Sequence, residues 1–415
     1  MIRHIKNISL LCGVHSPGHP LRNSDLAHLP VVSNAWLTME GTEITAYGQM
    51  GDKEPGFNYK ESQVEMIDAS GGMVIPSWVD SHTHLVFAAS RENEFVDKLH
   101  GLTYAQIAEK GGGILNSARK LNETSEDELF TTAWKRLQEV RSMGTGAIEI
   151  KSGYGLTLEG ELKMLRVIRK LRDRSGMLIK STFLGAHTYP EIYRNDHESY
   201  IQLLTEIMIP QIAAEKLADY IDVFCETGFF SREDTLRIGR AGIKYGLKPK
   251  LHANQLNLSG GVQAGVELNA VSVDHLETMD DETIECLANS STIGTLLPTA
   301  AFFLRMPFQP GRHLIDEGCA IALASDYNPG SSPSGNMNLV VSMACIGMKM
   351  MPEEAINAAT INGAFALEIQ DQVGSITIGK KANIIITKPI PSLAYLPYSF
   401  GNNLISKVII NGDLI

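Results

Sequence analysis

The sequence predicts an α/β fold, a (β/α)8 TIM-type barrel with a small β-sandwich domain formed by both termini. Three observations predict it. The middle of the 415-residue chain alternates apolar, β-branched runs with helix-like segments. Both ends contain short strand-like segments separated by polar turns. Polar side chains gather at the C-terminal end of most of the apolar runs, where barrels of this kind build their active sites.

The alternation in the middle region is regular. Between the runs lie segments with apolar residues at i, i+3, i+4 and i+7, the spacing of an amphipathic helix; clear examples are 126–143, 156–174 and 232–245. Repeated strand–helix units of this kind predict the barrel. The runs that we expect to form its strands are 73–87, 146–155, 178–187, 220–228, 247–255, 270–277, 291–298 and 320–329.

The domain boundaries follow from where this alternation begins and ends. Residues 1–75 and 369–415 carry short strand patterns around glycine and asparagine turns, and we expect them to pair as the two parts of the β-sandwich. Residues 76–368 are expected to form the barrel.

Composition excludes several classes of protein. A formal net charge of −11 argues against binding to nucleic acid, because such proteins normally carry a basic face. The five cysteines are scattered and form no CxxC pair, which favours a reducing compartment. No apolar run approaches the ~20 residues of a membrane span, and the N-terminus lacks the pattern of a signal peptide. We therefore expect a cytoplasmic protein.

A metal site is predicted at the mouth of the barrel. His82 and His84 lie two residues apart at the end of the first run, so both imidazoles point to the same side of a strand. His252 and Asp326, at the ends of the fifth and eighth runs, are the natural further ligands. Three histidines and one carboxylate suit one Zn²⁺ or iron ion per subunit. Such an ion makes water nucleophilic near neutral pH, which predicts a hydrolase.

Other polar residues end the remaining runs. A single histidine there is more often a hydrogen-bonded structural residue than a ligand, but several histidines and an aspartate at one end of a barrel favour a functional site. These further residues are Lys151, Tyr154, His187, Glu226, Gln255, His275 and Asn328.

The order of these motifs resembles the amidohydrolase superfamily, whose members carry a small β-sandwich built from both termini. Some members bridge two metals with a lysine on the fourth strand, but the run 220–228 contains none. We therefore expect one metal, with Lys151 as a charge partner. The motifs "HTHLVFAASRENEF", "KSGYGL", "TFLGAH", "SVDHLE" and "ASDYNPGSSP" are similar to those of the imidazolonepropionase family. This resemblance implies hydrolysis of 4-imidazolone-5-propanoate to N-formimidoyl-L-glutamate in histidine degradation.

A small-molecule substrate with a carboxylate tail needs a fixed cation and directional hydrogen bonds. Arg91 can bind the tail in a bidentate fork, although an ion pair with Glu92 or Glu94 is the alternative. The turn at "DYNPGSS" is expected to expose backbone N–H groups. The resemblance assigns Tyr104, Tyr154 and His187 to the substrate pocket. The turn adds Asn328, Gly330 and Ser331, and Gln255 can hydrogen-bond the ring.

One position departs from the family pattern. Many members carry a glutamate three residues after the fifth-strand histidine, in the role of proton shuttle, whereas this chain carries Gln255. A glutamine cannot exchange a proton near neutral pH, although it can hydrogen-bond the ring. We expect His275 to be the shuttle, with Asp326 as the second candidate.

The same glutamine leaves two other functions open. One is a deaminase or cyclic amidase of the superfamily that acts on another heterocycle, and the other is a non-catalytic barrel that binds a metal or small ligand. A possible homodimer is implied by the resemblance alone.

Overall fold

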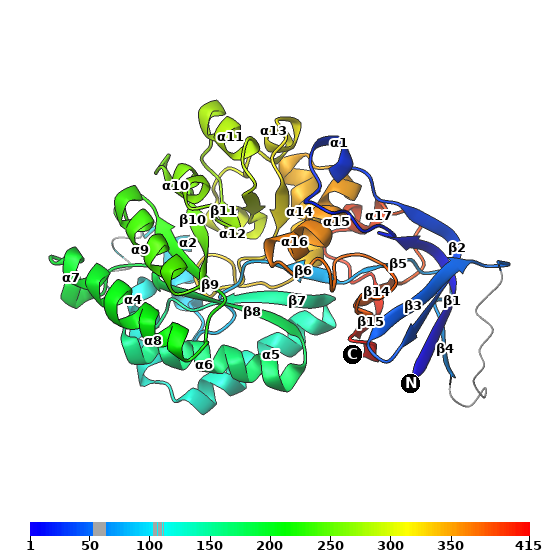
Figure 1. Cartoon of the computed structure of the whole chain (residues 1–415), viewed down its shortest axis with the longest axis horizontal. Coiled ribbons are helices and arrows are strands. Elements are labelled where there is room, and N and C mark those ends of the chain that lie inside the picture. The colour runs from blue at the N-terminus through cyan, green and yellow to red at the C-terminus, as the bar shows by residue number, and fades with distance from the viewer. Residues whose placement is uncertain (53–63, 103–105, 107–109, 111) are drawn as a thin grey trace.

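The computed structural model describes residues 1–52, 64–102, 106, 110 and 112–415, and it confirms the predicted fold class (Figure 1). Eight parallel strands pair in chain order, and each falls in one of the predicted runs, except that β7 begins one residue before its run. They are β6 (Trp78–Asp80), β7 (Thr145–Lys151), β8 (Leu178–Ala186), β9 (Tyr220–Cys225), β10 (Lys248–Ala253), β11 (Ser272–His275), β12 (Ile293–Leu296) and β13 (Ile321–Leu323).

The segments that follow the first and last of these strands close the barrel. The Asp326 N–H donates to His82 O at 3.0 Å, and the His84 N–H donates to Tyr327 O at 2.9 Å. These hydrogen bonds fix the predicted metal-binding histidines against the segment that carries Asp326. The hydrogen bonds that close the barrel therefore also position the site.

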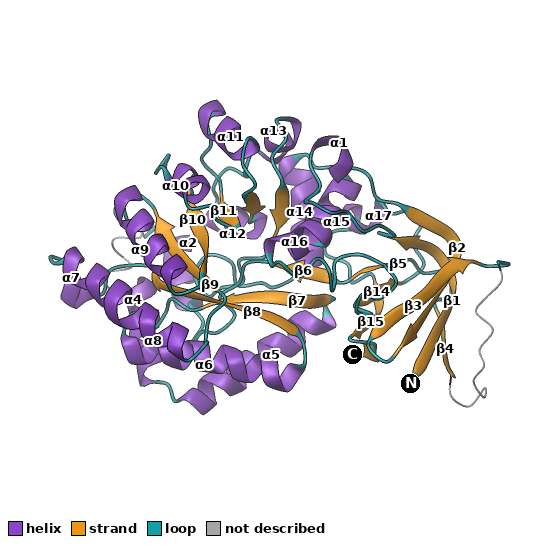
Figure 2. Cartoon of the chain, viewed as in Figure 1, coloured by secondary structure: helices purple, strands orange, loops and turns teal. Residues whose placement is uncertain are grey.

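Helices cover the outside of the barrel (Figure 2), and the three predicted segments are helical. Serine or threonine begins several of them; Ser125, for example, accepts the Glu128 N–H at the start of α5. The helices of the barrel region are α2 (Glu92–Leu99), α4 (Gly113–Glu123), α5 (Glu126–Ser142), α6 (Leu158–Ser175), α7 (His197–Gln202), α8 (Ile209–Ala214), α9 (Arg232–Lys244), α10 (Gly261–Glu267), α11 (Asp281–Ala288), α12 (Pro298–Leu304), α13 (Gly311–Asp316), α14 (Met337–Met348), α15 (Pro352–Ala359) and α16 (Ile361–Ala366).

The two ends of the chain form a second, mixed sheet beside the barrel. Strand β5 pairs antiparallel with β14 and parallel with β1, so the N- and C-terminal parts are hydrogen-bonded to each other. The run 73–87 thus contains two strands, β5 in this sheet and β6 in the barrel. The strands of the sheet are β1 (Ile2–Cys12), β2 (Val31–Glu40), β3 (Glu43–Gln49), β4 (Val64–Asp68), β5 (Val74–Pro76), β14 (Ile384–Thr387), β15 (Ile405–Ile410) and β16 (Asp413–Leu414).

The short helices α1 (Asn23–Leu26) and α17 (Tyr395–Tyr398) belong to these terminal regions. The sheet has its own apolar core, separate from that of the barrel. The domain boundaries after residues 75 and 368 remain a prediction.

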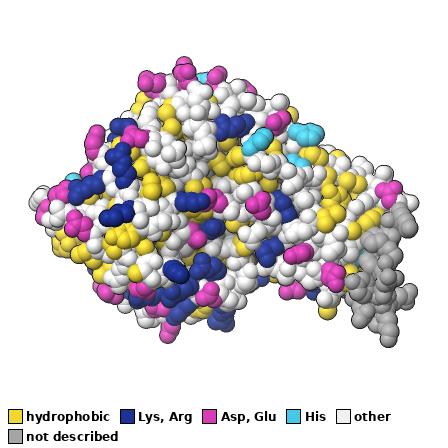
Figure 3. All heavy atoms as spheres, in the orientation of Figure 1, with side chains coloured by type: hydrophobic (Ala, Val, Ile, Leu, Met, Phe, Trp, Pro, Cys, Tyr) yellow, Lys and Arg dark blue, Asp and Glu magenta, His cyan; other side chains and the backbone are white. Residues whose placement is uncertain are grey.

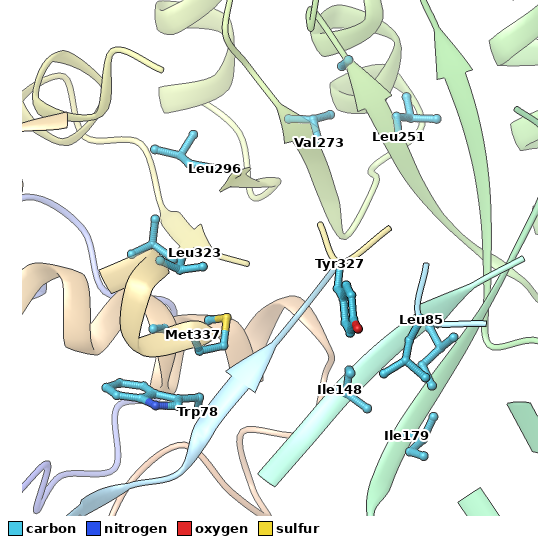
Figure 4. Close-up of a cluster of buried hydrophobic side chains, with 14 of the residues drawn as sticks. Trp78, Leu85, Ile148, Ile179, Leu251, Val273, Leu296, Leu323, Tyr327 and Met337 are labelled. Carbon is cyan, nitrogen blue, oxygen red and sulfur yellow. The ribbon is translucent and has the colours of Figure 1, made fainter. Parts of the chain in front are cut away.

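The two faces of the barrel strands have opposite character. Side chains alternate between the faces of a strand. One set is apolar and belongs to the same buried core as the inner faces of α5 and α6, and several of its members are shown in Figure 4, including Ile148, Leu251, Val273, Leu296 and Leu323. The other set contains buried charged residues that bind one another inside the barrel.

The outer surface carries charges of both signs. On the face shown in Figure 3, Lys and Arg side chains lie among Asp and Glu rather than forming one basic surface. Among the described helices, none has the combination of length and apolar character needed to cross a bilayer.

Candidate functional site

Three histidines meet at the mouth of the barrel, as the sequence predicted. One ring nitrogen from each of His82, His84 and His252 lies within 4.8 Å of the others. His82 Nε2 and His84 Nε2 lie 3.5 and 3.6 Å from the same Asp326 oxygen, Oδ1. All of these side chains are buried. The structure therefore brings three imidazoles and one carboxylate together around one point.

The chemistry of this donor set fits a metal ion. His82 Nε2 is buried and has no hydrogen-bond partner among the described residues, which would be costly in a site built only for packing. His84 Nε2 and His252 Nε2 are 3.3 Å apart. Burial lowers the pKa values of His82, His84 and His252 well below the ordinary histidine value, so the neutral, ligating form is favoured. These residues could hold a divalent metal.

Two buried aspartates orient the histidines. Asp274 Oδ2 lies 2.7 Å from His82 Nδ1, and Asp222 Oδ2 lies 2.9 Å from His252 Nδ1. A carboxylate accepts the Nδ1 proton, and this leaves Nε2 as the free, electron-donating nitrogen. Neither aspartate is among the residues predicted from the sequence. Two signals could have indicated them: Asp222 is the one charged residue in an otherwise largely apolar strand, and Asp274 lies on the same strand face as Ser272.

Lys151 lies beneath this pair of aspartates and is a charge partner, as expected. Its Nζ is 2.8 Å from Asp222 Oδ2, 3.4 Å from Asp274 Oδ2 and 2.6 Å from Glu149 Oε1. Burial alone would lower the pKa of Lys151, but the carboxylates, led by Asp222, raise it above the ordinary lysine value. The ammonium group is therefore held in its charged form.

Lys250 completes the buried network from the next side of the barrel. Its Nζ forms an ion pair with Glu149 and donates to Ser81 O at 3.1 Å. Two lysines thus face three carboxylates, Glu149, Asp222 and Asp274. The network carries one net negative charge if all five groups are ionised, which complements a cation at the neighbouring histidine cluster.

His275 and Glu277 form a second pair at the mouth. His275 Nδ1 lies 3.3 Å from Glu277 Oε1, which also accepts from Gln309 Nε2 at 3.0 Å. Burial lowers the pKa of His275, but the surrounding carboxylates, led by Glu277, more than offset this effect, and the net result is a raised pKa. His275 was predicted from the sequence and Glu277 was not, although the two are only two residues apart in "DHLE".

The backbone is strained at His275 and Asp326, the two candidates for the proton shuttle. His275 has φ 89° and Asp326 has φ 51°, a region that side chains other than glycine rarely adopt. Burial raises the pKa of the Asp326 carboxyl to about 7, and the nearby His275 opposes this rise. Both side chains are held in place at an energetic cost, as is common at functional sites.

One cavity of about 440 Å³ opens beside the histidines. His82 lies deeper and does not line it. Tyr104 falls outside the described residues. The predicted residues that line the cavity are His84, Arg91, Tyr154, His187, Gln255, His252, His275, Asp326, Asn328, Gly330 and Ser331.

His187 and Tyr154 form one wall of the cavity. The His187 ring stacks on His84 with 5.3 Å between centroids and an angle of 16°. His187 Nδ1 lies 3.1 Å from Gly153 O, and a carbonyl can only accept, so Nδ1 carries the proton and Nε2 is an acceptor. Burial lowers the pKa of His187 to about 4. The loop that carries Tyr154 is held by the buried Glu161, which accepts the N–H groups of Gly153, Gly155 and Leu156.

The turn after β13 differs from the sequence-based expectation. The Asn328 Oδ1 accepts the N–H groups of Gly330 and Ser331 at 2.7 and 2.8 Å. The prediction that this turn exposes those N–H groups is therefore wrong, because the asparagine side chain takes both donors in an Asx-type turn. Ser331 Oγ instead lies 3.3 Å from Asp326 Oδ2 and supports the carboxylate.

Arg91 both lines the cavity and forms the ion pair considered as its alternative role. Its Nε donates to Glu94 Oε2 at 2.8 Å, and Nη2 donates to the same oxygen at 2.5 Å. Glu94 Oε1 accepts the Gly113 N–H at 2.9 Å. Lys98 also lines the cavity and was missed, although a spacing of seven residues places it on the same side of a helix as Arg91.

Glu226, which ends the fourth run, does not line the cavity. Its carboxylate accepts the Leu256 N–H at 2.8 Å and Asn257 Nδ2 at 3.1 Å. It therefore fixes the loop that follows Gln255.

The barrel and its buried histidine cluster define an enzyme of the amidohydrolase class, and residues 246–415 match the amidohydrolase family model. Among solved structures, Escherichia coli guanine deaminase matches with a TM-score of 0.74 at 12% identity, covering 100% of this chain and 99% of that chain. An atrazine chlorohydrolase from Arthrobacter aurescens, solved with zinc, matches with a TM-score of 0.70 at 14% identity over 99% and 94% of the two chains. At these identities the likeness concerns the fold alone.

A curated sequence relative specifies the family. The imidazolonepropionase of Flavobacterium johnsoniae is 54% identical over 417 aligned positions, covering 100% of both chains. The chain belongs to the imidazolonepropionase family.

Proposed function

We propose that this chain hydrolyses the ring C–N bond of 4-imidazolone-5-propanoate and releases N-formimidoyl-L-glutamate, a step of histidine degradation. The observation that carries the proposal is that one cavity of about 440 Å³ joins the histidine cluster to Arg91. A reacting ring and a carboxylate tail can therefore bind at the same time. Family membership supports the same substrate.

His82, His84, His252 and Asp326 would hold one Zn²⁺ or iron ion per subunit, because a three-histidine, one-carboxylate set suits either metal. When bound, such an ion supplies Lewis acidity, which makes water nucleophilic near neutral pH and polarises a carbonyl group. Asp274 and Asp222 keep two of the imidazoles in the tautomer that directs Nε2 to the site.

In the proposed reaction, the oxygen of water forms a bond with the ring carbonyl carbon, and the bond from that carbon to the ring nitrogen breaks. One proton must leave the water, and one must reach the departing nitrogen. His275 can perform both transfers through Nε2, since its Nδ1 is directed to Glu277. Asp326 is the second candidate, because its carboxylate lies beside the histidine cluster and lines the same cavity.

Arg91 is proposed to bind the propionate tail, and Tyr154 to donate a hydrogen bond from its hydroxyl group. His187 Nε2 would accept a hydrogen bond from the ring. Gln255, in the same cavity, can hydrogen-bond the ring but cannot exchange a proton. In this assignment, the residues that bind the substrate are different from those that transfer protons.

The test uses purified, metal-loaded protein and freshly prepared imidazolone propionate, followed by loss of the substrate's ultraviolet band. We expect turnover by the wild type and none by His275→Ala, with the metal content of the variant unchanged. Absence of wild-type turnover would refute the proposed function. Turnover by the variant would instead assign the proton transfer to another group. Metal analysis of the same samples distinguishes zinc from iron.

A further inference from the structure

A second cation lies beside Arg91 at the cavity. Lys98, near the end of helix α2, is half-buried, and its Nζ lies 3.5 Å from Gly330 O. The Arg91 guanidinium also contacts Gly330, because a Cβ at that position would overlap Nη1. Both side chains line the cavity. Two positive groups thus converge on one backbone residue at the end of the pocket.

The charges of this group are not balanced within the described residues. Glu94 binds Arg91 through Oε2 and uses Oε1 for the Gly113 N–H. The Arg91–Glu94 pair is therefore neutral as a unit. Lys98 forms no ion pair within 4.0 Å with any carboxylate in the part of the chain that the structure describes. The cluster of two cations and one anion can accept one further carboxylate.

The surroundings of Lys98 make an unpaired ammonium unfavourable. Its side chain is partly withdrawn from water, and the cation–π contact of its Nζ with the Phe303 ring, at 5.8 Å from the centroid, compensates only part of the lost hydration. Burial lowers the pKa of Lys98, the Arg91 charge lowers it further, and Glu94 opposes the change only in part. An anion bound between Arg91 and Lys98 would relieve this repulsion.

We propose that Lys98 is a specificity-determining residue that supplies the net positive charge of a carboxylate subsite, while Arg91, already neutralised by Glu94, supplies geometry. The subsite takes the monocarboxylate tail of a planar heterocycle. This inference rests on the proposed function for the identity of the heterocycle, but the charge argument does not depend on catalysis.

Lys98→Met and Lys98→Arg are compared with the wild type, using imidazolone propionate and its uncharged propanamide. We expect Lys98→Met to raise KM for the acid about 10- to 100-fold, the loss expected for a hydrogen bond to a charged group. KM for the amide should change far less, and Lys98→Arg should restore most of the affinity for the acid. Lys120→Met, an exposed lysine on the neighbouring helix α4, is the matched control.

A binding experiment separates this inference from the proposed function. Imidazole-4-propanoate and its amide have no ring carbonyl to hydrolyse, and their affinities are measured by calorimetry. We expect the wild type to prefer the acid and Lys98→Met to lose that preference, whether or not the protein turns over imidazolone propionate. An equal effect of the variant on acid and amide would assign Lys98 a structural role, and an unchanged preference for the acid would equally overturn the proposal.

Discussion

Replacing Lys151 with methionine tests the buried network that supports the histidine cluster. Methionine keeps much of the apolar volume of the side chain but removes the charge. In the structure the Lys151 Nζ contacts three fully buried carboxylates, at 2.6 Å (Glu149), 2.8 Å (Asp222) and 3.4 Å (Asp274). Without it, only Lys250 remains to neutralise the three.

Removing one partner of a buried ion pair costs about 3–5 kcal/mol, because the remaining charge is left uncompensated. We expect a loss of this size for Lys151→Met in urea unfolding of protein stripped of metal at neutral pH. Lys170→Met is the control, since Lys170 pairs with Glu126 at 2.7 Å but is 47% exposed, and exposed pairs contribute about 0–1 kcal/mol. Equal losses of stability in the two variants would refute the inference that the buried carboxylates depend on the Lys151 charge.

Three further predictions concern the site. Asp274→Ala removes the acceptor that orients one of the metal-site histidines, and metal affinity measured by competition with a chelator should fall about 10- to 100-fold; unchanged affinity would contradict the orienting role. Glu277→Gln removes a charge that raises the pKa of His275. If His275 acts as the base, the acidic limb of the pH profile of kcat/KM should therefore move to lower pH. A limb that stays in place would exclude the pairing of His275 with Glu277. Gly330→Ala should displace the Arg91 guanidinium, which a Cβ would overlap, and raise KM for the carboxylate substrate about 10- to 100-fold; an unchanged KM would show that Arg91 does not bind the tail from its present position.

The fold could be predicted because its signals are periodic and local. Each of the eight strand runs combined β-branched residues with a following helical pattern, and these patterns do not depend on distant contacts. The predicted boundary after residue 75 falls inside the run 73–87, but the run itself does not show that it contains two separate strands, because β5 and β6 are separated by a single residue. The pairing of β5 with β14 depends on residues more than 300 positions away along the chain.

Site residues at the C-terminal ends of strands could be predicted from the sequence, whereas those buried deeper inside the barrel could not. His82, His84, His252 and Asp326 lie at or just beyond the C-terminal ends of their strands, and the geometry of a barrel brings such positions together. The buried network comes from four separate strands, and no single run shows which charges face one another. The prediction for the turn after Asp326 was wrong because it rested on the backbone alone. The Asn328 side chain accepts hydrogen bonds from both N–H groups of the turn.

The most direct test of the account is the fate of imidazolone propionate in water labelled with heavy oxygen. Metal-loaded wild-type protein should consume the substrate and place one labelled oxygen in the newly formed carboxylate of N-formimidoyl-glutamate, and protein stripped of metal should do neither. Substrate left intact by the loaded protein, or a product without the label, would contradict the assignment of this site to hydrolysis of the ring.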